Sequence, residues 1–219
     1  MRKLSIINKF LIVICEIVGL TTHFLGKSDI VPSFFYFTVL SNFGALVVFC
    51  FVLVKTINGG FSQKLQFAKM LVTQGILVTF VIYGFVLTPA MSLIDISTEL
   101  TFSSFILHYL APSLIFVDYC LYDNKGLIKW WHSFSYLSIF LLYPLYCYGY
   151  AFLGGTFNVD GVKTRYPYFF LDFDLLGIGQ VLKYVSLLMV SFLVVSLLFF
   201  ALDRIMSRYK TKSHRQIEK

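Results

Sequence analysis

The sequence predicts an all-α fold: a polytopic membrane protein built as one bundle of six transmembrane helices, with both termini in the cytoplasm. Of its 219 residues, 58% are hydrophobic and 13% are charged, and the mean hydropathy is +0.80. A soluble domain carries roughly 25% charged residues. Several apolar runs also exceed the ~18 residues that mark a membrane-spanning helix. The bilayer is therefore the expected solvent for a single transmembrane domain, residues 1–219.

Six apolar runs are long enough to cross about 30 Å of hydrocarbon at about 1.5 Å per residue. They lie near residues 10–26, 33–54, 69–92, 100–121, 131–153 and 178–202. The first run follows Arg2, Lys3 and Lys9, which could begin a signal peptide. However, Glu16 interrupts the run and no cleavage site of small residues follows, so we expect a membrane helix here.

The positive charges predict the orientation of the bundle. With the N-terminus in the cytoplasm, fourteen of the 18 Lys and Arg residues lie on the inner side and four on the outer side. Positively charged loops stay in the cytoplasm, so the bias places both termini inside, in what we expect to be a bacterial cytoplasmic membrane. The net charge of +7 then serves topology and attraction to membrane lipids. Nothing basic remains that would indicate nucleic-acid binding.

The connection over residues 154–177 is longer than the other loops. It reads GGTFNVDGVKTRYPYFFLDFDLLG, starting with glycines and ending in aromatic residues. One interpretation is an outer, lid-like loop folded over the mouth of the bundle. The other is a loop whose aromatic side chains lie in the interfacial belt of the membrane.

The cysteines favour neither a metal site nor a cofactor. Cys15, Cys50, Cys120 and Cys147 all fall inside predicted helices, and none has the spacing of a metal-binding motif. We expect free thiols that act as small apolar residues.

Ionisable residues inside the predicted helices are candidates for function because they are costly to insert. In the first helix, His23 follows Glu16 by seven residues and shares its face, so the two could form a proton or ion relay. In the fourth helix, His108 and Asp118 are ten residues apart, about 15 Å along the axis and about 80° around it. Asp118 therefore cannot orient His108, and we expect it to pair with a loop lysine such as Lys125.

Three polar residues in the second predicted helix lead to the most specific hypothesis about function. The stretch FFYFTVLSNFGALVV, residues 34–48, contains Thr38, Ser41 and Asn42. Counted from the outer ends of their helices, Thr38 and His108 lie roughly 7 and 12 Å deep, which places them near one level. A hydroxyl and an imidazole at one depth are the minimum for a nucleophile and its base. Ser41 and Asn42 could donate to an oxyanion or a lipid carbonyl, and Pro112 should kink the fourth helix beside His108.

Two other classes of function stay open on the residues alone. A threonine in a membrane helix often bonds to its own backbone or joins two helices, which would make this polar group structural in an assembly protein. A transporter would instead use Glu16, His23 and His108 as a polar path through the membrane. The concentration of polar groups in the outer half favours a one-sided site.

Four motifs, taken in order, resemble a known family. They are YFTVLSN at residues 36–42, LHYLAP with a following aspartate at 107–118, YPLYCYGY at 143–150 and RYPYFFLD at 165–172. This series is similar to the androgen-induced six-helix membrane proteins and their bacterial relatives. The resemblance implies a threonine-dependent hydrolase of lipid esters, such as fatty acid esters of hydroxy fatty acids, with Thr38 and His108 as its catalytic residues.

The expected mechanism is covalent, through an acyl-threonine intermediate on Thr38. Ser41 and Asn42 would bind the substrate or its oxyanion. Asp172 and Asp174 in the lid-like loop are candidates for supporting His108, because the loop returns to its level. This chemistry needs no metal and no organic cofactor.

Overall fold

The computed structural model spans residues 1–219 and describes all of them except 1, 26, 28, 88–100, 160–161 and 218–219. The described chain is mostly helical and divides into two compact units, Met1–Asp123 and Asn124–Lys219. Five of the described helices are long and apolar enough to cross a membrane: Arg2–Phe24, Phe37–Asn58, Gln63–Phe85, Phe102–Tyr122 and Ile178–Tyr209. The predicted class, an all-α membrane protein, is confirmed at this level.

The fifth predicted span corresponds to helix α7, His132–Phe152. This helix has 21 residues but is not among the five just named, since its tyrosines and serines lower its hydropathy. The count of six spans and the cytoplasmic location of both termini therefore stay predictions.

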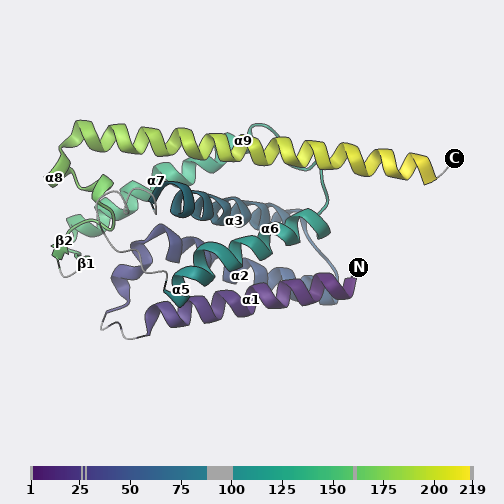
Figure 1. Ribbon diagram of the computed structural model, residues 1–219, viewed down its shortest axis with the longest axis horizontal. Coiled ribbons are helices and arrows are strands. Elements are labelled where there is room, and N and C mark those ends of the chain that lie inside the picture. The colour runs from purple at the N-terminus through teal and green to yellow at the C-terminus, as the bar shows by residue number, and fades with distance from the viewer. Residues whose placement is uncertain (1, 26, 28, 88–100, 160–161, 218–219) are drawn as a thin grey trace. The chain divides into compact units, whose positions relative to one another are not determined.

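The first unit is a bundle built on helices α1 (Arg2–Phe24), α2 (Phe37–Asn58), α3 (Gln63–Ile82) and α6 (Ala111–Tyr122). A short 3₁₀ turn, η1 (Val31–Phe35), precedes α2. The π-helical turn η2 (Tyr83–Leu87) extends α3, while α5 (Phe102–Phe105) and the π-helical turn η3 (Ile106–Leu110) lead into α6. Helix α1 packs against α2 and α6, and α2 packs against α3 (Figure 1).

The boundaries differ from prediction mainly where charged residues continue a helix. Helix α1 begins at Arg2, not near residue 10, because its basic first turns are helical as well. The predicted end of the third span, residues 88–92, lies outside the described residues.

The core of the first unit is layered along three helices. Ile12, Glu16 and Leu20 form one buried stripe of α1, four residues apart. Matching stripes on α2 and on η3 with α6 give three layers, named by the predicted orientation. The outer layer contains Leu20, Val39 and Leu107, the middle layer Glu16, Asn42 and Ala111, and the inner layer Ile12, Ala45 and Ile115.

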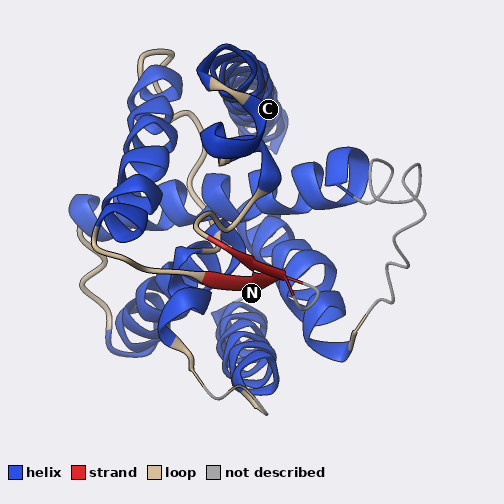
Figure 2. Cartoon of the chain, turned by 90° about the vertical axis from the view of Figure 1, so that its left-hand side faces the viewer, coloured by secondary structure: helices blue, strands red, loops and turns tan. Residues whose placement is uncertain are grey.

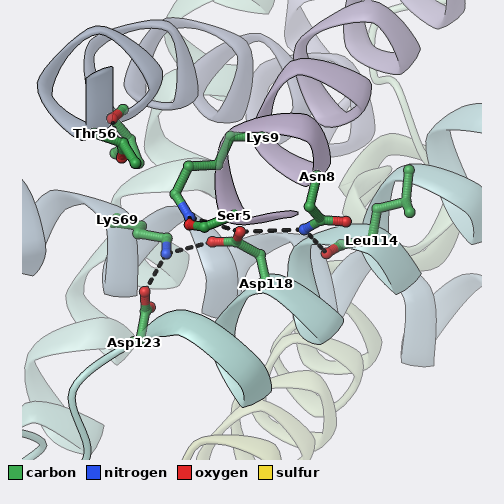
Figure 3. A network of polar contacts seen from close by, with 9 residues as sticks. Ser5, Asn8, Lys9, Thr56, Lys69, Leu114, Asp118 and Asp123 are labelled. Atoms are coloured by element: carbon green, nitrogen blue, oxygen red, sulfur yellow. Dashed lines mark hydrogen bonds and ion pairs between the residues drawn. The ribbon is translucent and has the colours of Figure 1, made fainter. Parts of the chain in front are cut away.

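Beneath the inner layer lies a buried network of ion pairs (Figure 3). Asp118 of α6 is fully buried, and its carboxylate pairs with Lys9 of α1 at 2.8 Å and with Lys69 of α3 at 2.5 Å. Lys69 also pairs with Asp123, and Asn8 donates to Asp118 at 3.1 Å. The network holds two positive and two negative charges, so the buried charge is balanced.

The expectation that Asp118 pairs with a loop lysine such as Lys125 was wrong. Its partners come from two neighbouring helices, because Lys9 and Lys69 lie within the folded helices and reach inward. Asp118 therefore links α1, α3 and α6. The predicted pair with Lys125 would have linked only the end of one helix to a loop.

The second unit is formed mainly by α7 and by α9, Ile178–Ile217, which pack against each other. Helix α9 runs well past the predicted end at residue 202, because the charged residues that follow are helix-compatible. Asp203 of α9 is fully buried and accepts hydrogen bonds from the backbone N–H groups of Gly126 and Ile128, at 2.9 and 3.3 Å. Gly126 has a φ of 82°, which favours glycine.

The predicted lid-like loop contains several short regular elements. It contains a hairpin of two antiparallel strands, β1 (Phe157–Val159) and β2 (Val162–Thr164), which stand out among the helices in Figure 2. A 3₁₀ turn, η4 (Phe169–Leu171), and the short helix α8 (Phe173–Leu176) follow. The hairpin is a local addition to a helical chain. A role of this loop as a lid stays a prediction.

We predict that Asp118→Asn destabilises the protein by about 3–5 kcal/mol, because it leaves two lysines buried without their shared carboxylate. Thermal unfolding in detergent measures this as a lower Tm. The matched control is Asp174→Asn, which removes an exposed ion pair with Arg165 worth about 0–1 kcal/mol. Equal effects of the two substitutions would contradict a central role for the buried network.

Candidate functional site

Thr38 and His108, the two residues predicted to act together, are in hydrogen-bond contact. Thr38 Oγ1 lies 3.1 Å from His108 Nε2, although the residues are 70 positions apart. His108 is buried, while Thr38 is half-buried. The contact between the two side chains is therefore partly buried.

The second nitrogen of His108 fixes the direction of this hydrogen bond. His108 Nδ1 lies 3.0 Å from the backbone carbonyl oxygen of Ser104. A carbonyl only accepts, so Nδ1 carries the hydrogen and donates it. In the neutral imidazole, Nε2 then holds the lone pair, and the hydroxyl of Thr38 donates to it. This is the arrangement by which a base activates a hydroxyl nucleophile.

Local backbone structure places each member of the pair. Thr38 is the second residue of α2, directly after the turn that η1 makes. His108 lies in the middle of the π-helical turn η3, where the backbone N–H of Ala111 bonds to the carbonyl of Ile106. Pro112 follows in the first turn of α6 and lacks the N–H that would bond to the His108 carbonyl. The predicted irregularity beside Pro112 therefore takes the form of a π-helical turn.

Ser41 and Asn42 hold the backbone of Thr38. Asn42 Nδ2 donates to the Thr38 carbonyl at 2.7 Å, and Ser41 Oγ donates to the same oxygen at 3.1 Å. Ser41 Oγ also lies 3.1 Å from Thr79 Oγ1 on α3. Both side chains thus have partners at Thr38 itself. Their direct contact with an oxyanion stays a prediction.

Tyr83 is a member of the site that the sequence did not indicate. Its ring stacks on the imidazole of His108, with centroids 3.7 Å apart and planes 19° from parallel. Tyr83 begins the π-helical turn η2 at the end of α3. Neither its spacing nor its residue type distinguishes it from the chain's other tyrosines, so only the fold reveals this contact.

Gly19 lets α1 approach the turn that carries His108. A Cβ atom at this position would lie 2.6 Å from Leu107 Cδ2 and 2.8 Å from Ile106 Cγ2. Both contacts are shorter than real side chains adopt, so a larger residue requires the side chains of Leu107 and Ile106 to shift.

Glu16 and His23, the two residues of the predicted relay, have different surroundings in the structure. Glu16 is fully buried in the middle layer. His23 lies in the last turn of α1, where its Nε2 accepts a hydrogen bond from Lys27 Nζ at 2.8 Å. Lys27 also donates to Ser33 at 2.9 Å, and its partial burial lowers the pKa of its ammonium. A relay through Glu16 and His23 stays a prediction.

Asp172 and Asp174 have local partners in the second unit. Asp172 Oδ1 accepts a hydrogen bond from the Leu175 backbone N–H at 2.9 Å and so caps α8. Asp174 Oδ2 lies 3.3 Å from Arg165 and from the Tyr166 hydroxyl. A role of either carboxylate toward His108 stays a prediction. Within the described part of the chain, no group of three or more His, Cys, Asp or Glu residues could hold a metal ion.

We predict that Gly19→Val destabilises the first unit by about 1–3 kcal/mol, because the added carbon atoms overlap the side chains of Leu107 and Ile106. The measurement is the Tm of the purified protein in detergent. Gly44→Ala is the control, since its Cβ would meet only Val72 Cγ1 at 3.9 Å, an ordinary contact. A Gly19→Val protein as stable as wild type would show that α1 does not need this close approach.

A comparison of the chain with protein-family models, with curated proteins and with solved structures found no match. The resemblance carried by the four sequence motifs therefore stays a prediction. What can be argued about function rests on the contacts of Thr38 and His108.

Proposed function

We propose that the protein is an intramembrane hydrolase of lipid esters that uses Thr38 as its nucleophile and His108 as its general base. The observation that carries this proposal is the 3.1 Å contact between Thr38 Oγ1 and His108 Nε2, with Nδ1 held by the Ser104 carbonyl. A structural threonine in a helix commonly bonds to its own backbone, as Thr56 does to the Val52 carbonyl at 2.7 Å. The Thr38 hydroxyl instead meets a base on another helix.

The reaction proceeds in two steps. Thr38 Oγ attacks the ester carbonyl carbon while His108 Nε2 takes the hydroxyl proton. The carbon–oxygen bond to the alcohol breaks, and His108 returns the proton to that leaving group, which leaves the acyl group on Thr38. Water then attacks the acyl-threonine, gives a proton to His108 and releases the fatty acid, with the proton restored to Thr38.

The start of α2 offers donors for the oxyanion. Thr38 and Val39 lie in the first turn of a 22-residue helix, where backbone N–H groups have no acceptor within the helix. The helix dipole also favours negative charge at this end. An oxyanion formed beside Thr38 Oγ would therefore meet backbone donors. Ser41 and Asn42 would act by fixing the Thr38 backbone.

The surroundings favour a lipid substrate. Thr38 is half-buried on a membrane-spanning helix, and the nearby residues Leu40 and Phe43 of the same helix are exposed. Exposed apolar side chains on such a helix face acyl chains. A substrate that reaches Thr38 along this surface is itself apolar, with an ester group near the level of the hydroxyl.

The test is labelling with a fluorophosphonate, which reacts with activated hydroxyl nucleophiles. Wild-type protein in detergent should be labelled, and Thr38→Ala and His108→Ala should each lose at least about 100-fold in labelling rate, as expected for loss of a nucleophile or its base. Thr56→Ala is the matched control, because it removes a threonine of the same helix that bonds to its own backbone. Absence of wild-type labelling, or equal labelling of Thr38→Ala, would exclude the proposed nucleophile.

We also predict that Tyr83 positions His108 through ring stacking. Tyr83→Ala frees one face of the imidazole and should slow labelling about tenfold, equivalent to about 1.4 kcal/mol and within the range of aromatic pairs. Tyr83→Phe keeps the ring and should restore the rate to within about twofold of wild type. If Tyr83→Phe is as slow as Tyr83→Ala, the hydroxyl of Tyr83 and not its stacking matters.

A further inference from the structure

Glu16 lies in the core of the first unit, where none of the ion pairs or hydrogen bonds between described residues involves its carboxyl group. Its side chain is fully buried, and in the part of the chain that the structure describes neither Oε1 nor Oε2 has a hydrogen-bond partner. A carboxylate in such a place would be very costly without a cation, because burial removes its hydration. The chemistry at Thr38 makes no use of this group.

Asn42 lies at the same level of the bundle as Glu16. Helices α1 and α2 run antiparallel and share the outer layer through Leu20 and Val39, and the inner layer through Ile12 and Ala45. Glu16 is four residues from Leu20 and from Ile12, while Asn42 is three residues from Val39 and from Ala45. At about 1.5 Å per residue, Glu16 and Asn42 therefore lie midway between the same two layers.

In both residues of this layer, the side-chain atoms without a described partner are oxygens, which accept hydrogen bonds. Asn42 Nδ2 donates to the Thr38 carbonyl at 2.7 Å, which leaves Oδ1 turned elsewhere. That Oδ1 is buried and, among the described residues, has no donor. Two carboxyl oxygens and an amide oxygen thus share one layer. A hydrogen between them would satisfy both side chains.

We propose that Glu16 and Asn42 form a proton-binding site inside the membrane bundle, in which Glu16 is protonated and its O–H donates to Asn42 Oδ1. One proton removes the buried charge and supplies the donor that Asn42 lacks. The site extends the polar chain from Glu16 through Asn42 to the Thr38 backbone. It does not depend on Thr38 being a nucleophile.

A proton fits this layer better than a metal ion does. Sodium or calcium needs about six oxygen ligands. The third member of the middle layer is Ala111, and the layers on either side are apolar. These three layers offer only the side-chain oxygens of Glu16 and Asn42, fewer than such a cation needs, whereas a proton needs only one acceptor.

The charged groups on the packed helices have other partners. On α1 and α6, Lys9 and Asp118 pair with each other below the inner layer, and Lys69 of α3 joins them. On η3, His108 bonds to Thr38 and Ser104. Among these groups none is engaged with Glu16, so its charge would have no counterion in the described bundle.

Infrared spectroscopy tests the proposal directly, since a carboxylic acid has a carbonyl stretch that a carboxylate lacks. The chain has three glutamates, Glu16, Glu99 and Glu218. Protein labelled with ¹³C at the glutamate carboxyl, at neutral pH in sodium-free buffer, should show an isotope-shifted acid band. Glu16→Gln should abolish that band, and the matched control Glu218→Gln should leave it unchanged.

Asn42→Leu keeps Glu16 and removes its acceptor, so the acid band should persist at a shifted frequency. This variant also keeps the test decisive if Glu16→Gln does not fold. Absence of a labelled acid band in wild type at neutral pH would overturn the proposal. Loss of the band on adding sodium chloride, with potassium chloride as the control for ionic strength, would equally overturn it in favour of a cation site.

Discussion

The first unit depends on the burial of Asp118 between two lysines from other helices. Its carboxylate contacts Lys9 and Lys69 within ordinary ion-pair distance, and all three side chains are almost completely buried. Burying such an ion pair costs desolvation free energy. Removing one partner destabilises the fold further, because it leaves a buried charge without a counterion. We infer that the pairing favours one relative placement of α1, α3 and α6, because each lysine must reach the same carboxylate. Figure 3 shows how the three helices converge on this point.

The ion pairs fix the helices at the inner end of the bundle, and the layers of the core follow from there toward the outer end. A three-residue step along α1 and α6 leads from the ion pairs to the inner layer, and four-residue steps lead on through the middle layer to the outer layer. Thr38 and His108 meet beside the outer layer, where α2 begins and the fourth helix is π-helical. Helix α2, which carries Thr38, packs against α1 and α3, two of the three helices that the ion pairs join.

The sequence alone predicted that Thr38 and His108 lie together, but it did not predict the residues that hold them in place. Counting residues from the helix ends placed Thr38 and His108 at one depth, and helical rise is regular enough for such a count to hold. It could not show Tyr83, because a stacked ring depends on the rotation of α3 about its axis. The partners of Asp118 were missed for a related reason: Lys9 was counted as a residue outside the span, yet α1 is helical from Arg2 onward. Charged residues ended the apolar runs of α1 and α9 but did not end the helices.

Helix α9 has a consequence for where this protein can act. Its 40 residues extend roughly 60 Å, about twice the thickness of the hydrocarbon core. Tilting does not absorb the excess, since at a tilt of about 40°, the upper end of the usual range, a helix of this length still rises roughly 46 Å along the membrane normal. With α9 as a membrane span, one end of the helix extends beyond the lipid tails, and a group bound there would sit at a distance from the bilayer set by the length of the helix.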